Sequence, residues 1–351
     1  MFHLHVGNKV EREDGRGDEH YLRRWSIDDN DYRDYLKQDI INADSQLVSI
    51  KELGVDVEYG HLSERKSPVK LFNAGLRLRK ICKEKNIDFV HVFWGSTTAI
   101  TAVIFSPCPV IISFSGSDLI GMVSENGKIT LSGHISKFLS NSSALLAASI
   151  ITKSENMRNE LWKISKNKST AIPNGLDLSK FKPMSQMEAQ NYLGWSNEKK
   201  YIIFFSGLGA TVKDLPLAQK IFSIIQKIIP DAEMKILNKI PHNELVYYYN
   251  AADVMLLTSF HEGSNNSLKE ARACNLPIVS VNCGDAAERL KNVSNSYVID
   301  SRDPEEIASN VLSVLKSDKR SNGALLSEDV KMETIAKKIV SVYNQLKNDK
   351  Q

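Results

Sequence analysis

Cysteine is scarce in this sequence, and a long apolar run is missing. The four cysteines among 351 residues show no Cys-x-x-Cys pair and no metal-ligand spacing; they are Cys82, Cys108, Cys274 and Cys283. This usage predicts reduced thiols, with no disulfide framework and no metal site. No stretch approaches the roughly 20 apolar residues of a membrane-spanning helix, and residues 1–14 lack the apolar region of a secretory signal. We therefore expect a cytoplasmic protein that can meet a membrane only at its surface.

A large excess of charge of one sign is also missing. The chain carries 45 Lys and Arg against 42 Asp and Glu, a formal net charge of +3. A dedicated nucleic-acid-binding protein needs a more concentrated basic surface, so we expect no nucleic acid partner. The mild excess is compatible with an anionic substrate or with peripheral membrane association. The basic segment LRLRKICKEK at 76–85 could meet such a membrane, although a solvated helix face is the simpler interpretation.

Short apolar runs alternate with longer segments of helical periodicity, a pattern typical of parallel βαβ units. The segment 31–53 has apolar residues at helical spacing, followed by Gly54 as a stop signal. The segment 329–347 has the pattern of an amphipathic closing helix. Strands are predicted at 2–6, 55–59, 88–94, 109–114, 149–152 and 170–173, and then at 201–207, 232–237, 253–259, 277–281 and 296–300.

A polar stretch at 179–190 divides these strands into two sets. It predicts an α/β protein of two doubly wound parallel-sheet domains, residues 1–178 and 179–329, with a C-terminal helix at about 330–351 that can pack back on the first domain. Ligands of such sheets bind beyond the carboxyl ends of the strands. The cleft between the two domains is therefore the expected active site.

The stretch 258–288 is the most informative part of the chain. It predicts a buried strand, a polar turn rich in Gly, Ser and Asn, and a helix that begins near Asn266 or Ser267. Backbone N–H groups of such a turn and the helix N-terminus bind phosphate oxygens. Glu262 and Glu270 beside the turn can accept hydrogen bonds from sugar or ribose hydroxyls. A nucleotide sugar presents all of these groups. The structural alternative is that Ser267-x-x-Glu270 is a capping box and Glu262 an ordinary loop carboxylate.

The whole stretch resembles the signature of glycosyltransferase family 4, the group 1 glycosyltransferases of GT-B fold. The matching residues are Glu262-Gly263, Glu270 eight positions on, Pro277-Ile278-Val279, and Gly284-Asp285 with Glu288. Three other segments resemble the same family: SFSGSDLIG at 113–121, AIPNGLDLSKFKP at 171–183 and LVYYYNAADVMLLTS at 245–259. The resemblance extends from about residue 88 to residue 310.

The resemblance implies two Rossmann-like domains facing a central cleft, with the acceptor on residues 1–178 and the nucleotide sugar on 179–329. It implies sugar transfer from a UDP- or GDP-sugar to a glycan or lipid-linked acceptor, with retention of configuration and without a metal or other cofactor, as in bacterial surface polysaccharide synthesis. Glu262 and Lys213 would be the catalytic pair, on the donor sugar and the diphosphate, and Glu270 would bind the ribose. The other implied site residues are Gly207, Gly263, Ser264, Asn265, Asn266 and Ser267 on the donor side, and Ser115, Gly116 and Asp118 on the acceptor side.

Two groups of positions depart from the family pattern. The arginine that accompanies the lysine is absent, because Leu208 and Thr211 stand at its usual places, and Arg272 is another cation close in sequence. On the acceptor side, Ser115 and Phe93 stand where the family has histidines. Serine can form a hydrogen bond but carries no positive charge. His91 is kept, and the charged stretch 9–24 replaces a Gly-Gly loop.

Three alternatives stay open. A sugar-nucleotide epimerase of the same two-domain fold would act on the donor without an acceptor. A non-catalytic nucleotide- or carbohydrate-binding protein would bind the donor without turnover. A metal-dependent transferase of the other common fold would need an Asp-x-Asp pair, which Asp29-Asn30-Asp31 matches in letters, although acidic residues are also expected at a helix start.

Overall fold

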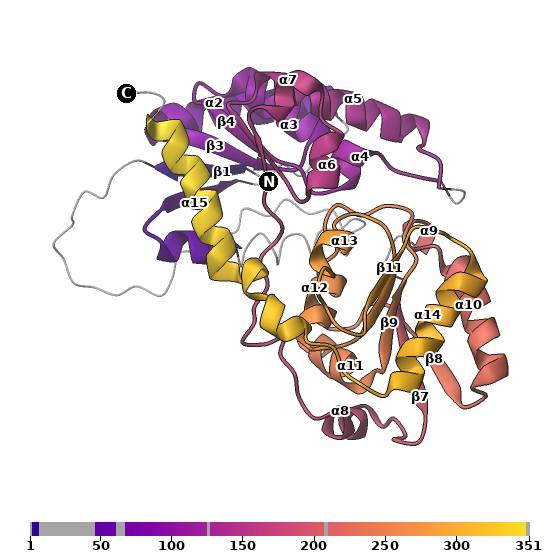
Figure 1. The fold of residues 1–351 in the computed structure, drawn as a ribbon. Coiled ribbons are helices and arrows are strands. Elements are labelled where there is room, and N and C mark those ends of the chain that lie inside the picture. Colours follow the sequence, from indigo (N-terminus) through magenta and orange to yellow (C-terminus); the bar gives the residue numbers. More distant parts are fainter. Residues whose placement is uncertain (1, 7–45, 61–66, 125–126, 207–209, 349–351) are drawn as a thin grey trace, which may run out of the picture.

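The computed structural model describes residues 2–6, 46–60, 67–124, 127–206 and 210–348, and these form two separate sheets (Figure 1). The first sheet has the order β2-β1-β3-β4-β5-β6 and the second the order β11-β10-β9-β7-β8. The strands are β1 (Phe2–Val6), β2 (Asp56–Gly60), β3 (Ile87–Phe93), β4 (Val110–Ser113), β5 (Ser149–Thr152), β6 (Ser169–Ala171), β7 (Lys200–Phe205), β8 (Ala232–Leu237), β9 (Val254–Leu257), β10 (Ile278–Val281) and β11 (Tyr297–Ile299). Each overlaps a predicted run, so the two-domain α/β prediction is confirmed.

One strand differs from the predicted all-parallel pattern. The second sheet is parallel throughout, and β3 to β6 are parallel in the first. In contrast, β1 pairs antiparallel with both β2 and β3. Parallel neighbours along the chain need a crossover connection, usually a helix, whereas antiparallel strands do not, so β1 departs from the βαβ pattern of the other strands.

Helices cover both faces of the sheets, and β4, β9 and β10 are consequently buried at every position. Side chains of Ser67, Thr130 and Ser154 cap α2, α5 and α6 by accepting backbone N–H groups. Residues 46–52 are helical, and Gly54 ends that helix with φ +83°, as predicted. The other helices are α2 (Pro68–Glu84), α3 (Ser96–Phe105), α4 (Ser117–Ile120), α5 (Leu131–Leu146), α6 (Glu155–Asn159), α7 (Lys163–Lys166), α8 (Gln186–Leu193), α9 (Ala210–Lys213), α10 (Leu215–Ile228), α11 (Leu245–Ala251), α12 (Asn266–Ala273), α13 (Ala286–Arg289), α14 (Pro304–Ser317) and α15 (Met332–Asn348), with 3₁₀ turns η1 (Gly323–Leu326) and η2 (Glu328–Val330).

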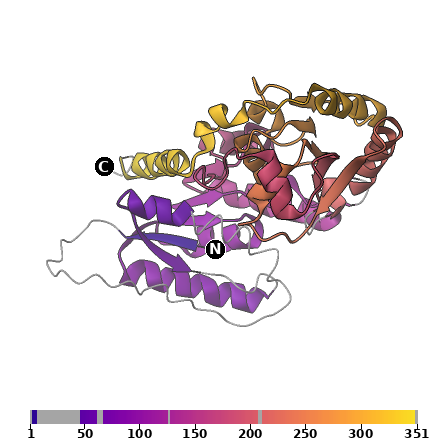
Figure 2. The same ribbon diagram turned by 90° about the horizontal axis from the view of Figure 1, so that it is seen from below.

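Alternate residues of the first sheet serve two different cores. Ile112 and Ile150 pack with residues of α2, α3 and α5 on one face. Their neighbours Ile111 and Ile151 pack on the other face with Ile335, Ile339 and Tyr343 of α15. The C-terminal helix therefore leaves the second domain and completes the core of the first, as both ribbon views show (Figures 1 and 2).

Two chain segments connect the domains and lie against each other. Leu176, which follows β6, donates its N–H to Val330 O at 2.7 Å and accepts from Met332 N at 3.0 Å. At Gly175 a Cβ atom would lie 2.6 Å from Met332 Sδ and 2.9 Å from its Cα, so only glycine permits this approach. The Pro-Asn-Gly turn thus has a physical role, because it brings the two connections into register.

Within the described residues, no helix is long and apolar enough to cross a membrane. Several predictions concern residues outside that part of the chain: the helix before residue 46, the charged stretch 9–24, the Asp29-Asn30-Asp31 motif, Gly207 and Leu208.

Candidate functional site

The loop between β9 and α12 is built by the cap of Asn265. This residue has extended backbone angles, φ −73° and ψ 116°, and its side chain accepts the N–H of Leu268 at 3.1 Å. The helix begins at Asn266, and the third helical position is therefore Leu268 rather than Glu270. The capping-box alternative is wrong, because Ser267 is not the cap and Glu270 lies too far along the helix to reach back to it.

Glu270 is held instead by two side chains from the neighbouring elements. Its Oε2 accepts from Tyr249 Oη at 2.6 Å, and its Oε1 lies 3.2 Å from His242 Nε2. Tyr249 is fully buried, and burial raises the pKa of its hydroxyl well above the ordinary value, so it stays a proton donor. The sequence did not single out Tyr249 or His242. The tyrosine lies in the 245–259 segment of the family resemblance, which was the available signal.

Lys213 and Glu262, the predicted catalytic pair, are 49 positions apart in the sequence and meet near the carboxyl ends of β7 and β9. Lys213 Nζ donates to Glu262 Oε1 at 2.5 Å, and Ser259 Oγ donates to the same oxygen at 2.8 Å. Both side chains of the ion pair are largely shielded, with 20% and 16% exposed. Thr258, which follows β9, links the end of this strand to the end of α9, because its Oγ1 donates to Lys213 O at 2.7 Å.

The acceptor-side loop of the first domain touches the donor loop of the second. A Cβ atom at Gly263 would lie 2.8 Å from Ser115 O and 3.2 Å from Gly116 Cα. On the opposite side of Glu262, a Cβ atom at Gly284 would lie 2.8 Å from Glu262 Cβ. Glycine at positions 263 and 284 therefore allows the loop of Ser115 and Gly116 and the loop of Gly284 to pack directly against the loop that carries Glu262. The structure thus brings the predicted donor-side and acceptor-side residues together.

Asp118 organises the acceptor-side loop from within. Its carboxylate accepts the backbone N–H groups of Gly95 and Gly116, each at 2.7 Å, and of Ser115 at 3.1 Å. The side chain is buried, and this burial raises the pKa of the carboxyl while the amide hydrogen bonds oppose the rise. Its carboxylate is engaged by its own loop, so Asp118 shapes the acceptor side and is not turned toward a ligand.

His91 is also a structural residue. Its Nδ1 lies 2.6 Å from Tyr343 Oη and its Nε2 lies 2.7 Å from Ser113 Oγ, which ties β3 to α15 and β4. Burial lowers the pKa of His91 to about 3, so the ring is neutral at physiological pH. It therefore supplies no positive charge in place of the histidines that are missing at Phe93 and Ser115.

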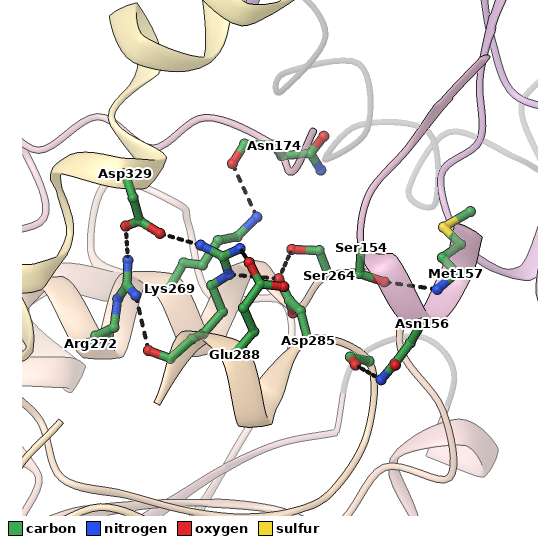
Figure 3. A network of polar contacts seen from close by, with 12 residues as sticks. Ser154, Asn156, Met157, Asn174, Ser264, Lys269, Arg272, Asp285, Glu288 and Asp329 are labelled. Carbon is green, nitrogen blue, oxygen red and sulfur yellow. Dashed lines mark hydrogen bonds and ion pairs between the residues drawn. The ribbon is translucent and has the colours of Figure 1, made fainter. Parts of the chain in front are cut away.

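A polar network continues from the donor loop to the chain connection (Figure 3). Ser264 Oγ donates to Asp285 Oδ2 at 2.7 Å, and Arg289 Nε donates to the same oxygen at 3.1 Å. Arg289 and Arg272 both bind the carboxylate of Asp329, which lies in η2 just before α15. Arg272 is buried and directed at Asp329, so it is not the missing diphosphate cation.

Three buried polar atoms of the site have no hydrogen-bond partner in the described structure. They are His261 Nε2, Asn265 Nδ2 and Asp285 Oδ1. Buried polar atoms normally find a partner, and their concentration around one loop is typical of a site that binds a polar ligand. Burial also lowers the pKa of His261, which favours the neutral ring.

Three further cations near the loops were not predicted. Arg302, after β11, donates to Thr258 O at 2.7 Å and pairs with Asp214. Lys153, directly after β5, and Lys269 of α12 are both buried. Lys269 Nζ donates to Asn174 O of the domain connection at 3.1 Å, and burial lowers its pKa to about 8. Lys269 lies inside the 258–288 stretch but was not singled out there, and Arg302 and Lys153 lie outside the motifs of the sequence analysis.

Comparisons with known proteins agree with this fold. The model of the "Glycosyltransferase Family 4" family matches residues 40–180, and that of "Glycosyl transferases group 1" matches residues 196–338. The two models together cover most of the chain, one for each domain. The chain belongs to the group 1 glycosyltransferases of family 4 and has the GT-B fold.

Individual relatives are more distant. O-antigen chain mannosyltransferase B of Escherichia coli is 24% identical over 132 residues, which are 38% of this chain and 33% of that protein. The match thus spans about a third of the relative's length. Among solved structures, sucrose-phosphate synthase from Thermosynechococcus elongatus has a TM-score of 0.64 at 15% identity, covering 82% of this chain and 81% of that one. A glycosyltransferase from Rickettsia africae has a TM-score of 0.64 at 13% identity, covering 90% and 96%. Anabaena HepE in complex with UDP has a TM-score of 0.61 at 15% identity, covering 78% and 82%.

Proposed function

We propose that this glycosyltransferase transfers a sugar, with retention of configuration and without a metal, from a UDP- or GDP-sugar to a glycan or lipid-linked acceptor. The observation that carries the proposal is the Lys213–Glu262 ion pair near the carboxyl ends of β7 and β9, in a loop whose Gly263 approaches the backbone of Ser115 and Gly116 in the first domain. A cation for the diphosphate and an anion for sugar hydroxyls lie side by side where the fold places ligands.

Binding of the donor would exchange the partners of this ion pair. The diphosphate would take the ammonium of Lys213, and the released Glu262 carboxylate would accept hydrogen bonds from the sugar. The N-terminus of α12 would add N–H groups beside the phosphates. Glu270, oriented by Tyr249, keeps lone pairs free for ribose hydroxyls.

In the transfer step, negative charge grows on the leaving diphosphate. Lys213 and the helix N-terminus stabilise this charge, which lowers the barrier more than it stabilises the bound donor. The acceptor enters beside Ser115, on the same face of the sugar as the leaving group. A phosphate oxygen of the leaving group takes the acceptor proton, so that no protein nucleophile is required.

The acceptor and the cellular setting are part of the proposal. HepE was solved with UDP, and the Escherichia coli relative is named as an O-antigen chain mannosyltransferase. These names support a nucleoside diphosphate donor and a role in surface polysaccharide synthesis. We place the protein in the cytoplasm, in peripheral contact with the membrane that carries a lipid-linked acceptor.

The proposal is tested with the full chain. A thermal-shift screen of UDP-, GDP- and ADP-sugars identifies the donor, and NMR of the product from a lipid-linked or soluble glycan acceptor gives its anomeric configuration. Retention in transfer without added metal, and in the presence of a chelator, is the expected result. Conversion of the donor in the absence of any acceptor would favour the epimerase alternative. Donor binding with no turnover on any acceptor would favour a binding protein.

A further inference from the structure

The outer side of α5 and α7 exposes a group of large apolar side chains, which we call the α5–α7 face. The most exposed are Leu131 at 78%, Ile164 at 73%, Leu146 at 65% and Phe138 at 61%. The complete group comprises Leu131, Ile135, Phe138, Leu145 and Leu146 of α5, Trp162, and Ile164 of α7. Single exposed apolar residues are ordinary, whereas a contiguous group marks an interaction surface.

Helical spacing makes this face continuous. Leu131, Ile135 and Phe138 follow one another at intervals of four and three residues, so they lie on one side of α5. Phe138 contacts Trp162 edge to face, with ring centroids 5.9 Å apart, which joins α5 to the start of α7. In Figure 1, α5 and α7 lie at the top of the first domain, away from the second domain below.

The charge around this face is mostly positive. Residues 127–176 contain seven Lys and Arg, of which Lys153 is buried, and two Asp and Glu. Both carboxylates are paired, Glu160 with Lys137 and Glu155 with Arg158. Lys163 and Lys166 lie on α7 itself, beside Trp162 and Ile164.

An apolar face bordered by lysines and an aromatic ring matches the boundary of an anionic lipid leaflet. Apolar side chains enter the acyl region, Trp prefers the headgroup level, and lysines meet the anionic headgroups. A second copy of the chain fits less well, because a symmetric interface would bring the same lysines opposite each other. The positive charge therefore favours binding to an anionic membrane over self-association of the chain.

The inner side of the same helix holds the acceptor-side loop. Ser140 Oγ donates to Asp118 O at 2.6 Å, and Ser136 Oγ donates to the same oxygen at 3.3 Å. Asp118 in turn binds the N–H groups of Ser115 and Gly116. The outer side of α5 thus exposes apolar residues, while its inner side holds the acceptor-side loop that contains Ser115 and Gly116.

We propose that the α5–α7 face docks on an anionic phospholipid leaflet and so sets the acceptor-side loop at a defined distance from the membrane. The docking itself depends only on this face. Its use in delivering a lipid-linked acceptor rests on the proposed function.

Vesicle flotation with the full chain tests the docking. We expect binding to vesicles that contain phosphatidylglycerol and little binding to vesicles of phosphatidylcholine alone. The double variant Ile135→Gln, Phe138→Gln should bind at least about tenfold more weakly, because two apolar anchors are lost. Lys163→Glu should weaken binding by roughly fivefold or more, and added salt should reduce binding of the wild type. The matched control is Leu325→Gln, an exposed leucine of the second domain, which should bind within about twofold of the wild type.

Two further readouts separate docking from folding and from catalysis. Melting temperature and nucleoside diphosphate affinity should be unchanged in the double variant, since the donor site lies in the second domain. A mass measurement in solution reports self-association. Equal binding of the double variant and the wild type, or equal binding to both kinds of vesicle, would overturn the proposal. So would a dimer that the double variant dissociates, with no vesicle binding. Transfer to a soluble acceptor can fail or succeed independently, and that result concerns the proposed function alone.

Discussion

Replacement of Lys213 by alanine tests the donor site most directly. In the structure the ammonium is 2.5 Å from Glu262 Oε1, and it would have to exchange this partner for the diphosphate. A charge-assisted contact contributes about 1.5–3 kcal/mol, from which the cost of breaking the partly shielded ion pair, about 1 kcal/mol or less, must be subtracted. Lys213→Ala should therefore weaken UDP or GDP binding by roughly tenfold, since about 1.4 kcal/mol corresponds to a factor of ten.

The variant Glu262→Gln separates the two contributions. It removes the carboxylate that competes for Lys213 but keeps the side-chain shape. Affinity for the free nucleoside diphosphate should stay equal or rise by up to about fivefold, whereas the transfer rate should fall because the sugar loses a charged acceptor. In the double variant Lys213→Ala, Glu262→Gln, the glutamine should have no effect on nucleotide affinity beyond that of Lys213→Ala, because the carboxylate competes with the nucleotide only for Lys213.

Isothermal titration with UDP and GDP provides the affinities, and melting temperature controls for folding. Lys220→Ala, an exposed lysine of α10 in the same domain, is the matched control and should bind as the wild type does. If Lys213→Ala is folded and binds both nucleotides with unchanged affinity, Lys213 does not contact the diphosphate and the site must be placed elsewhere.

Three other changes give distinct results. Glu270→Gln should lower nucleotide affinity by about 1 kcal/mol with little loss of stability, since an amide oxygen can still accept a hydrogen bond from Tyr249. Titration with the nucleotide and melting curves check this, and an unchanged affinity would argue against a ribose contact. Gly263→Ala should reduce transfer far more than nucleotide affinity, because its Cβ would lie 2.8 Å from Ser115 O; equal losses in both measurements would contradict a role at the domain contact. Burial lowers the pKa of His91 from 6.5 to about 3 in the folded chain. Between these two pH values the unfolded chain therefore binds one proton that the folded chain does not bind. The free energy of unfolding should consequently fall as the pH drops through this window, by at most about 1.4 kcal/mol per pH unit. His91→Gln should remove that part of the slope, which denaturant unfolding at pH 7 and pH 5 would detect.

The sequence predicted the strands well because they are short apolar runs, and three of them, β4, β9 and β10, are buried at every position. A run such as Val254–Leu257 has one stable environment in an α/β fold, the inside of a parallel sheet. The direction of β1 was not predictable in this way. β1 lies between β2 and β3 and pairs antiparallel with both, and reversing the direction of a strand does not change which of its residues are apolar.

The residues of the proposed donor site could be picked out from the sequence, but their contacts could not. Glycines and glutamates of the loop were visible as a pattern, and two of them, Gly263 and Glu262, lie where two loops converge. The predicted start of α12, near Asn266 or Ser267, is confirmed, whereas the capping-box alternative placed the cap at Ser267, and Ser267 and Asn265 are both good caps. The choice between them depends on the extended backbone at Asn265, which the end of β9 and the turn impose.

The polar network behind the loop could not have been predicted, because its members are far apart in the sequence. Arg272 and Asp329 are separated by 57 positions, and Arg289 and Asp329 by 40. The two arginines share one carboxylate, and a charge this buried is tolerated only when its partner is present. Through Asp285 and Ser264 the same network reaches the donor loop, and through η2 it reaches the helix that completes the first domain. The loop that carries Glu262 is thus joined through Ser264, contact by contact, to the chain connection between the domains, and this link is a property of the fold rather than of any motif.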